Sequence, residues 1–116
     1  MGAGQRLPRR ARMLKPAEFK LAFAEGARIV RPPLAVVYRR NPLGHPRIGL
    51  AIARKAVSKA VVRNLVKRLI REEFRLHQER LPALDLVFYV PPGSARLDAA
   101  SIRAALERIW SRLATA

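Results

Sequence analysis

The chain has 116 residues, half of them apolar, which is enough for one hydrophobic core but not for two. Its 24 lysines and arginines oppose 8 acidic residues, giving a formal charge of +16, so a polyanion is the expected partner and nucleic acid is the commonest one. The lack of cysteine excludes disulfides and cysteine-ligated zinc, and no apolar run approaches the roughly 20 residues that span a bilayer.

The first 13 residues predict a basic, poorly ordered arm. Gly2, Gly4 and Pro8 discourage regular structure in this arginine-rich segment. An organelle transit peptide would share the excess of arginine, but this segment lacks serine. We therefore interpret residues 1–13 as a nucleic-acid-binding arm of a cytoplasmic protein with no membrane partner, and residues 14–116 as one domain.

A short helix is predicted over residues 16–25. Pro16 suits the first turn, where its missing N–H leaves no hydrogen bond unmade, and Gly26 is a suitable C-terminal stop. Phe19 and Phe23 lie four residues apart and therefore share one face of this helix.

Two or three strands follow. Two of them are placed at residues 34–38 and 47–53, and the turn-forming residues between these two suggest a hairpin. The second strand places large apolar side chains on one face and glycine or alanine on the other. The face of small residues predicts close packing against another element.

The longest predicted helix spans residues 58–78, which contain neither glycine nor proline. Its apolar stripe comprises Val61, Leu65, Leu69 and Ile70, extended by Val62, Val66 and Phe74. A strand at residues 84–90 follows, and Asp98 can cap a last helix with apolar residues at helical spacing. The pattern is typical of a compact α+β or α/β sandwich with helices packed on one sheet.

Basic residues recur along the long helix and the segment before it: Arg54, Lys55, Lys59, Arg63, Lys67, Arg68, Arg71 and Arg75. Six of them, from Lys55 to Arg75, recur at every fourth position, and like charges at this spacing destabilise a helix. Only Glu72 and Glu73 offer nearby compensation, through pairs such as Arg68–Glu72. A bound anion would remove the repulsion, whereas the charges of a merely solvated helix usually alternate in sign. Asn64 lies within this row and either donates to a phosphate or a base edge or faces water.

Three aromatic residues, Phe19, Phe23 and Tyr38, precede the basic helix. Aromatic side chains beside a basic groove stack unpaired bases, but spacing alone favours an ordinary core role for the two phenylalanines. The sequence contains no phosphate-binding glycine loop, no Ser–His–Asp arrangement and no carboxylate cluster suited to Mg²⁺. It therefore predicts no catalytic and no metal-ligating residue.

The segments RIGLAIARK at 47–55 and AVVRNLVKRLIREEFR at 60–75 resemble the signature of the bacterial ribonuclease P protein component. That family carries R-x-G-L-x-x-x-K-K followed by A-x-x-R-N-R-x-K-R-x-x-R-E-x-F-R. The likeness extends over nearly the whole chain from about residue 6. It implies an α-β-β-β-α-β-α fold in which the helix between two parallel strands crosses in a left-handed sense, against the usual right-handed rule.

The resemblance also implies a function. The family assists the catalytic RNA of ribonuclease P, an endonuclease that removes the 5′ leader of precursor tRNA by hydrolysis. The RNA binds Mg²⁺ and performs the chemistry, while the protein binds that RNA and contacts the leader. The expected partners are therefore the catalytic RNA and precursor tRNA, with no obligate protein partner.

Residue by residue, the resemblance implies a face that meets the catalytic RNA, formed by Arg54, Lys55, Arg63, Asn64, Lys67, Arg68 and Arg71. We add Lys59 to this predicted RNA-binding face because it belongs to the same row of basic residues. It implies a leader-binding cleft lined by Phe19, Phe23 and Tyr38. Two positions depart from the family pattern. Leu65 replaces an arginine, which removes one expected RNA contact, and Arg54 stands where lysine is common.

Three other functions compete with this one. A structural ribosomal protein would share the charge, and only the long motif argues against it. A DNA-binding factor that reads the major groove would need a scaffold helix before the basic helix, where a strand is predicted instead. A self-contained nuclease would need clustered carboxylates.

Overall fold

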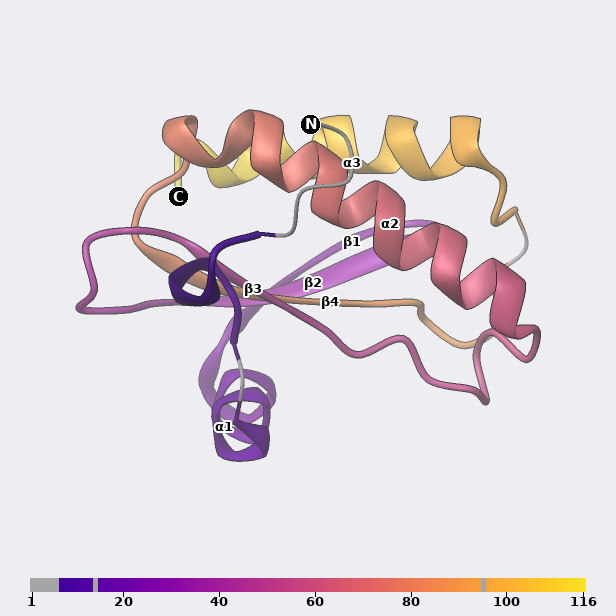
Figure 1. Ribbon diagram of the computed structural model, residues 1–116, viewed down its shortest axis with the longest axis horizontal. Helices are drawn as coiled ribbons and strands as arrows, with labels where there is room; N and C mark the ends of the chain where they lie inside the picture. Colours follow the sequence, from indigo (N-terminus) through magenta and orange to yellow (C-terminus); the bar gives the residue numbers. More distant parts are fainter. Residues whose placement is uncertain (1–6, 14, 95) are drawn as a thin grey trace.

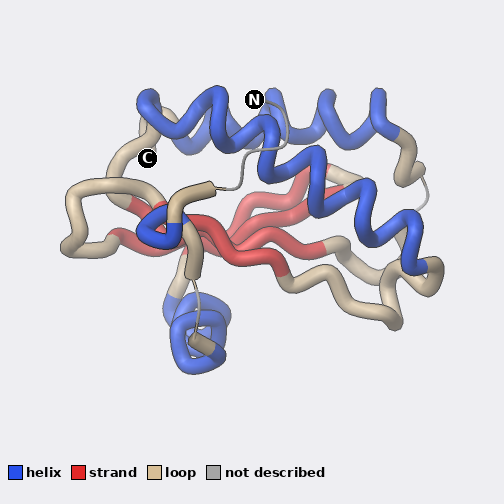
Figure 2. Tube along the Cα trace, viewed as in Figure 1, coloured by secondary structure: helices blue, strands red, loops and turns tan. Residues whose placement is uncertain are grey.

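The computed structural model describes residues 7–13, 15–94 and 96–116. Its elements are α1 (Pro16–Glu25), β1 (Ala27–Arg31), β2 (Leu34–Arg40), β3 (Arg47–Leu50), α2 (Ala60–His77), β4 (Leu84–Tyr89) and α3 (Ala99–Leu113), with short 3₁₀ turns η2 (Arg9–Ala11) and η3 (Gln78–Arg80). The strands form one sheet, with α1 on one face and α2 and α3 side by side on the other (Figures 1 and 2). The predicted α+β architecture and the bounds of α1 are confirmed.

The strand order in the sheet is β1-β2-β4-β3, with β3 and β4 parallel and the other pairs antiparallel. The predicted hairpin between β2 and β3 is therefore wrong, because β4 lies between them. Five of the six residues of β4 are buried, and a strand that is covered on both faces is most stable between two partners. From β3 the chain passes through α2 and returns to β4 behind β3 in the view of Figure 1, which makes the crossover left-handed.

The strand β1 is the third strand before α2 that the family resemblance implies, but the residue pattern did not give its position. Only Ile29 is buried among its five residues, so the strand lacks a clear alternation of apolar and polar side chains. It pairs along β2 from Ala27 opposite Tyr38 to Arg31 opposite Leu34. The hairpin of this fold is therefore β1–β2, and β1 is an edge strand.

The main core lies between the sheet and the two long helices. Leu34 and Val36 of β2 and Leu86 and Phe88 of β4 are buried there. The opposite helical layer supplies the residues predicted from spacing, Ile102, Leu106, Ile109 and Leu113 of α3. Asp98 caps α3 as predicted, because its side chain accepts a hydrogen bond of 2.8 Å from the Ser101 N–H.

The buried stripe of α2 matches the prediction except at its N-terminal end. Val61 is 73% exposed, whereas Val66, Leu69, Ile70 and Phe74 are fully buried. The helix begins only at Ala60, so Val61 lies in its first turn, on the side away from the core. Leu65, which replaces the arginine of the family pattern, packs against the core as a partly buried residue.

Residues 7–13 do not form the poorly ordered arm that the sequence predicts, and residues 1–6 lie outside the described part. Leu7, Ala11 and Met13 are buried. The Met13 N–H donates to the Ile48 carbonyl at 2.8 Å, next to a bridge between Arg12 and Ile48. Burial of these apolar side chains outweighs the effect of Pro8 and the arginines, so this segment covers the open edge of the sheet at β3.

Candidate nucleic-acid interface

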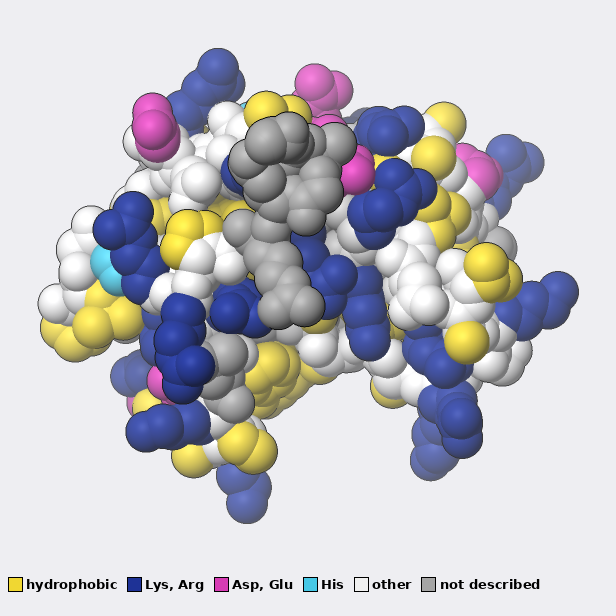
Figure 3. All heavy atoms as spheres, in the orientation of Figure 1, with side chains coloured by type: hydrophobic (Ala, Val, Ile, Leu, Met, Phe, Trp, Pro, Cys, Tyr) yellow, Lys and Arg dark blue, Asp and Glu magenta, His cyan; other side chains and the backbone are white. Residues whose placement is uncertain are grey.

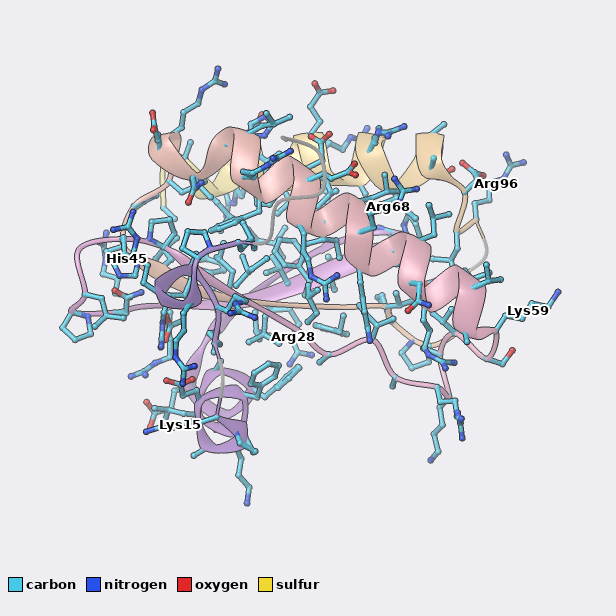
Figure 4. All side chains as sticks on the ribbon, in the orientation of Figure 1. Lys15, Arg28, His45, Lys59, Arg68 and Arg96 are labelled. Atoms are coloured by element: carbon cyan, nitrogen blue, oxygen red, sulfur yellow. The ribbon has the colours of Figure 1, made fainter. Side chains whose placement is uncertain are left out.

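The outer side of α2 carries the basic residues that the sequence singles out. Asn64, Arg68 and Arg71 are exposed and Lys67 is half-buried, opposite the stripe that packs into the core. Figure 4 shows Lys59 and Arg68 directed away from the sheet, and Figure 3 shows Lys and Arg side chains gathered along this side of the molecule. We call Lys59, Arg63, Asn64, Lys67, Arg68 and Arg71 the α2 basic face.

The row of cations at every fourth position is helical only from Arg63 onwards. Lys55 lies in a turn and Lys59 is the residue before the first helical turn, both exposed. Arg63 connects the two parts, since its Nη1 donates to the carbonyls of Val57 and Ser58, both at 2.9 Å. This side chain therefore fixes the segment that presents Arg54, Lys55 and Lys59 beside the N-terminus of α2.

Little of this positive charge is compensated within the protein. The predicted pair is present, with Arg68 Nη1 at 3.3 Å from Glu72 Oε2. Among the described residues, Lys59, Lys67 and Arg71 form no ion pair. Exposed like charges at i,i+4 destabilise a helix by a few tenths of a kcal/mol per pair, and a bound polyanion would reverse that effect.

The N-terminus of α2 differs from those of the other two helices. Glu18 accepts from the Lys15 N–H at 3.1 Å at the start of α1, and Asp98 caps α3. The start of α2 has neither a capping side chain nor an acid in its first turn. Free N–H groups and the positive end of the helix dipole favour an anion, and the neighbouring cations strengthen that preference.

A second set of side chains lies on the other face of the sheet, beneath α1. Phe23 is 38% exposed, and its ring centroid lies 5.6 Å from that of Tyr89. The Arg28 guanidinium lies 5.6 Å from the Tyr89 centroid on the same face, in cation–π contact. We call Phe23, Tyr89 and Arg28 the aromatic platform.

Phe19 and Tyr38 are not part of this platform. Phe19 packs into the small core beneath α1, against Met13, Val37 and Val87. Tyr38 packs against the main core on the opposite face of the sheet. Successive side chains of a strand point to opposite faces, so Val37, not Tyr38, faces α1. The implied grouping of Phe19, Phe23 and Tyr38 is therefore corrected: Tyr89, which sequence reasoning missed, takes the place of Tyr38.

Close contact between α1 and the sheet depends on Gly49. A Cβ added to Gly49 would lie 2.6 Å from Cζ of Phe19, which is the close packing that the small-residue face of β3 predicts. We expect Gly49→Ala to displace the Phe19 ring and lower the free energy of unfolding by about 1–3 kcal/mol, measured by guanidinium denaturation. Gly44→Ala is the control, because its Cβ would meet nothing within 4 Å and would test only the positive φ of 82°. A smaller loss for Gly49→Ala than for Gly44→Ala would contradict this packing.

A partly buried ionic network also holds α1 to the sheet. Arg47 donates to both oxygens of Asp85, at 2.9 and 2.8 Å, and to Glu18 at 2.9 Å. Asn41 donates to Asp85 at 2.9 Å. Glu18 belongs to α1, so Arg47 joins this helix to β3 and β4.

The network shifts the pKa values of its members. Burial opposes the charge of Asp85, but hydrogen bonds from Arg47 and Asn41 and the nearby positive charge hold the pKa of this carboxyl below its usual value. The hydrogen bond to Asp85 raises the pKa of Arg47, against the effect of burial. Both groups are therefore charged throughout the neutral range, as a bidentate pair.

The acidic and histidine side chains of the described residues are scattered. No three of their His, Asp and Glu side chains gather closely enough to hold one, and both Asp85 oxygens are bound by Arg47. Within the same residues, no helix is long and apolar enough to cross a membrane.

Comparison with known proteins decides the family. The family model described as Ribonuclease P matches residues 7–114. The chain belongs to the ribonuclease P protein family. It is 47% identical to the ribonuclease P protein component of Yersinia enterocolitica, over 90% of this chain and 88% of the relative. The component from Escherichia coli O157:H7 is 46% identical over the same shares.

Solved structures of ribonuclease P proteins share the fold. The protein from Staphylococcus aureus matches with a TM-score of 0.77 at 25% identity, covering 95% of this chain and 94% of the other. The protein from Thermotoga maritima matches with a TM-score of 0.72 at 27% identity, covering 87% and 96%. The role in tRNA processing as the protein component of ribonuclease P follows from the family.

Proposed function

We propose that this chain binds the catalytic RNA of ribonuclease P through the α2 basic face and the segment before it. The observation that carries the proposal is the uncompensated charge around the uncapped N-terminus of α2, which combines free N–H donors with Lys59 and Arg63. Arg68 and Arg71 extend the same surface by about two helical turns. Guanidinium groups bind phosphates through two parallel hydrogen bonds, which suits a structured RNA backbone.

We propose further that the 5′ leader of precursor tRNA lies on the aromatic platform. Unpaired bases stack on aromatic rings whatever their identity, at about 1–3 kcal/mol per base. The exposed Phe23 and the Tyr89 ring offer such a surface, and Arg28 adds a charge for the phosphates. Sequence-tolerant stacking suits leaders that differ between substrates.

Mg²⁺ belongs to the RNA in this proposal. Among the described residues, no three His, Asp or Glu side chains could hold a metal ion together. Mg²⁺ is usually held in such enzymes by substrate phosphates and one or two carboxylates, so an ion bound mainly by the RNA would need little from this chain. No chemical step is therefore assigned to a residue of this chain. Its residues bind and position the two RNAs.

Cleavage of precursor tRNA labelled at its 5′ end tests the function. At low Mg²⁺, we expect correct cleavage with the protein and a ribonuclease P RNA together, and little with either alone. Cleavage by the protein alone would place the chemistry in this chain. A mixture no more active than the RNA alone would favour a structural RNA-binding role.

Replacement of Phe23 tests the leader contact. We expect Phe23→Ala to weaken binding of leader-bearing precursor tRNA to the assembled enzyme by about 5- to 100-fold, and to leave mature tRNA nearly unaffected. Tyr89→Ala should act in the same direction. Leu21→Ala is the matched control, because Leu21 lies on the same helix and is 40% exposed. Equal losses for both RNAs would make Phe23 a packing residue.

A further inference from the structure

A second basic surface lies on α3, at the opposite edge of the sheet from β3. It is a shallow hollow of about 800 Å³ between the C-terminal half of α3 and the edge strand β1, lined by Arg31, Ala104, Glu107, Arg108, Ser111, Arg112 and Thr115. None of its lining residues comes from α2. The family assignment and the α2 basic face do not account for this hollow.

Its charge resembles that of the α2 basic face. Arg108 and Arg112 are exposed at i,i+4 and, among the described residues, form no ion pair. Arg31 joins them from β1, where its Nη1 donates to the Val30 carbonyl at 2.8 Å and its other N–H groups remain available to a ligand. Three guanidinium groups from two elements therefore converge on one hollow, against the single carboxylate of Glu107.

The remaining polar groups suit a phosphate backbone. Thr115 Oγ1 donates to the Arg112 carbonyl at 3.1 Å and can still accept, and the Ser111 hydroxyl is exposed. No aromatic side chain lines the hollow, so it offers nothing on which an unpaired base could stack. Arginine and hydroxyl groups without aromatics recognise the backbone of a paired helix, which RNA-binding domains read by shape, phosphates and 2′-hydroxyls.

We propose that this hollow binds the phosphodiester backbone of a base-paired RNA segment. One chain would then hold two RNA segments at once, one along α2 and one along α3. An acidic peptide is the less favoured occupant. Arg108 and Arg112 lie four residues apart on α3, about 6 Å along the helix axis, and such a pair suits the closely and regularly repeated charge of a nucleic-acid strand.

Glu107 gives the proposal a test that damaged folding cannot imitate. A carboxylate in the hollow repels phosphate, so Glu107→Gln should tighten RNA binding there. Arg108→Gln with Arg112→Gln should weaken the same binding. Opposite effects from neighbouring positions on one exposed helix face would not arise from loss of structure.

The experiment uses the protein bound to immobilised catalytic RNA and a labelled RNA hairpin of about 20 base pairs as the second ligand. We expect the complex to capture the hairpin, and the Arg108→Gln/Arg112→Gln protein to bind it about tenfold or more weakly. The slope of log K against log salt should fall by about 0.9 for each phosphate that the variant no longer neutralises. The charge-matched control is Arg80→Gln/Arg103→Gln, two exposed residues that do not line the hollow.

Retention of the protein on the catalytic RNA measures binding through the α2 basic face, whereas capture of the hairpin measures binding through the hollow. Failure of the α2 proposal can therefore be distinguished from failure of the α3 proposal. The α3 proposal is overturned if the hairpin is not captured, or if the control variant loses as much affinity as the Arg108→Gln/Arg112→Gln variant. It is also overturned if Glu107→Gln weakens capture. Binding of an acidic oligopeptide that depends on Arg108 and Arg112, without capture of the hairpin, would assign the hollow to an acidic protein instead.

Discussion

Replacing Lys67 and Arg71 together by alanine is expected to weaken binding of the catalytic RNA about 30-fold or more at low salt. This magnitude is a lower bound, because it takes only about 1 kcal/mol from each side chain, whereas a hydrogen bond to a charged phosphate contributes about 1.5–3 kcal/mol. The salt dependence should flatten as well, by about 0.7–0.9 in the log–log slope for each phosphate that is no longer neutralised. Titrations of labelled RNA at several salt concentrations measure both quantities.

The stability of the same variant separates binding from folding. Lys67 and Arg71 are like charges one turn apart on α2, so their removal should leave the melting temperature unchanged or slightly raised. Arg80→Ala with Arg103→Ala removes the same charge from other exposed positions. If this control weakens RNA binding as strongly, the effect is one of net charge, and the α2 basic face is not the RNA surface.

Replacing Asp85 by alanine is expected to destabilise the protein by about 3–5 kcal/mol. The Arg47 and Asp85 side chains are 16% and 9% exposed, so this change leaves a largely buried guanidinium. Among the described residues, Glu18 would be its remaining acidic partner. Such a loss corresponds to a fall in melting temperature of more than about 10 °C for a domain of this size. Asp98→Ala is the comparison, because loss of the α3 cap costs about 1 kcal/mol.

The pH dependence of stability is a second test of the contribution of the Asp85 carboxylate. Its pKa is lower in the folded protein than in the unfolded chain, so its stabilising contribution is complete above the unfolded value of about 3.9 and is lost as pH falls through the folded value. The native protein should therefore lose stability in that acid range. The Asp85→Asn variant should lose less free energy of unfolding over this acid range than the unmodified protein. If the two proteins lose stability equally as pH falls, the role of the Arg47–Asp85 pair is contradicted.

Features set by local periodicity could be predicted from the sequence. The bounds of α1, the cap at Asp98 and the buried stripe of α3 all follow from spacing and capping chemistry. The exposed cations of α2 follow in the same way, because charge and helical period together define a face. The long motif indicated the left-handed crossover, which the general rules of chain connection would have excluded.

Features set by pairing between distant segments could not be predicted. The placement of β4 between β2 and β3 depends on which strands bury both faces, a property of the sheet as a whole. The exchange of Tyr38 for Tyr89 depends on strand register, in which a shift of one residue changes the face. A signal was present in the alternation of β2, since Leu34 and Val36 share a side with Tyr38.

The placement of helices on both faces of one sheet has a mechanical consequence for the proposed complex. Neighbouring residues of β4 lie on opposite faces of the sheet. Phe88 packs in the core beneath α2 and α3, whereas Tyr89 lies beneath α1. The α2 basic face and the aromatic platform are therefore separated by a hydrogen-bonded layer that deforms far less than a loop. The protein would act as a rigid spacer between catalytic RNA and leader, so the leader nucleotides that reach Phe23 would be selected by their distance from the cleavage site rather than by their sequence.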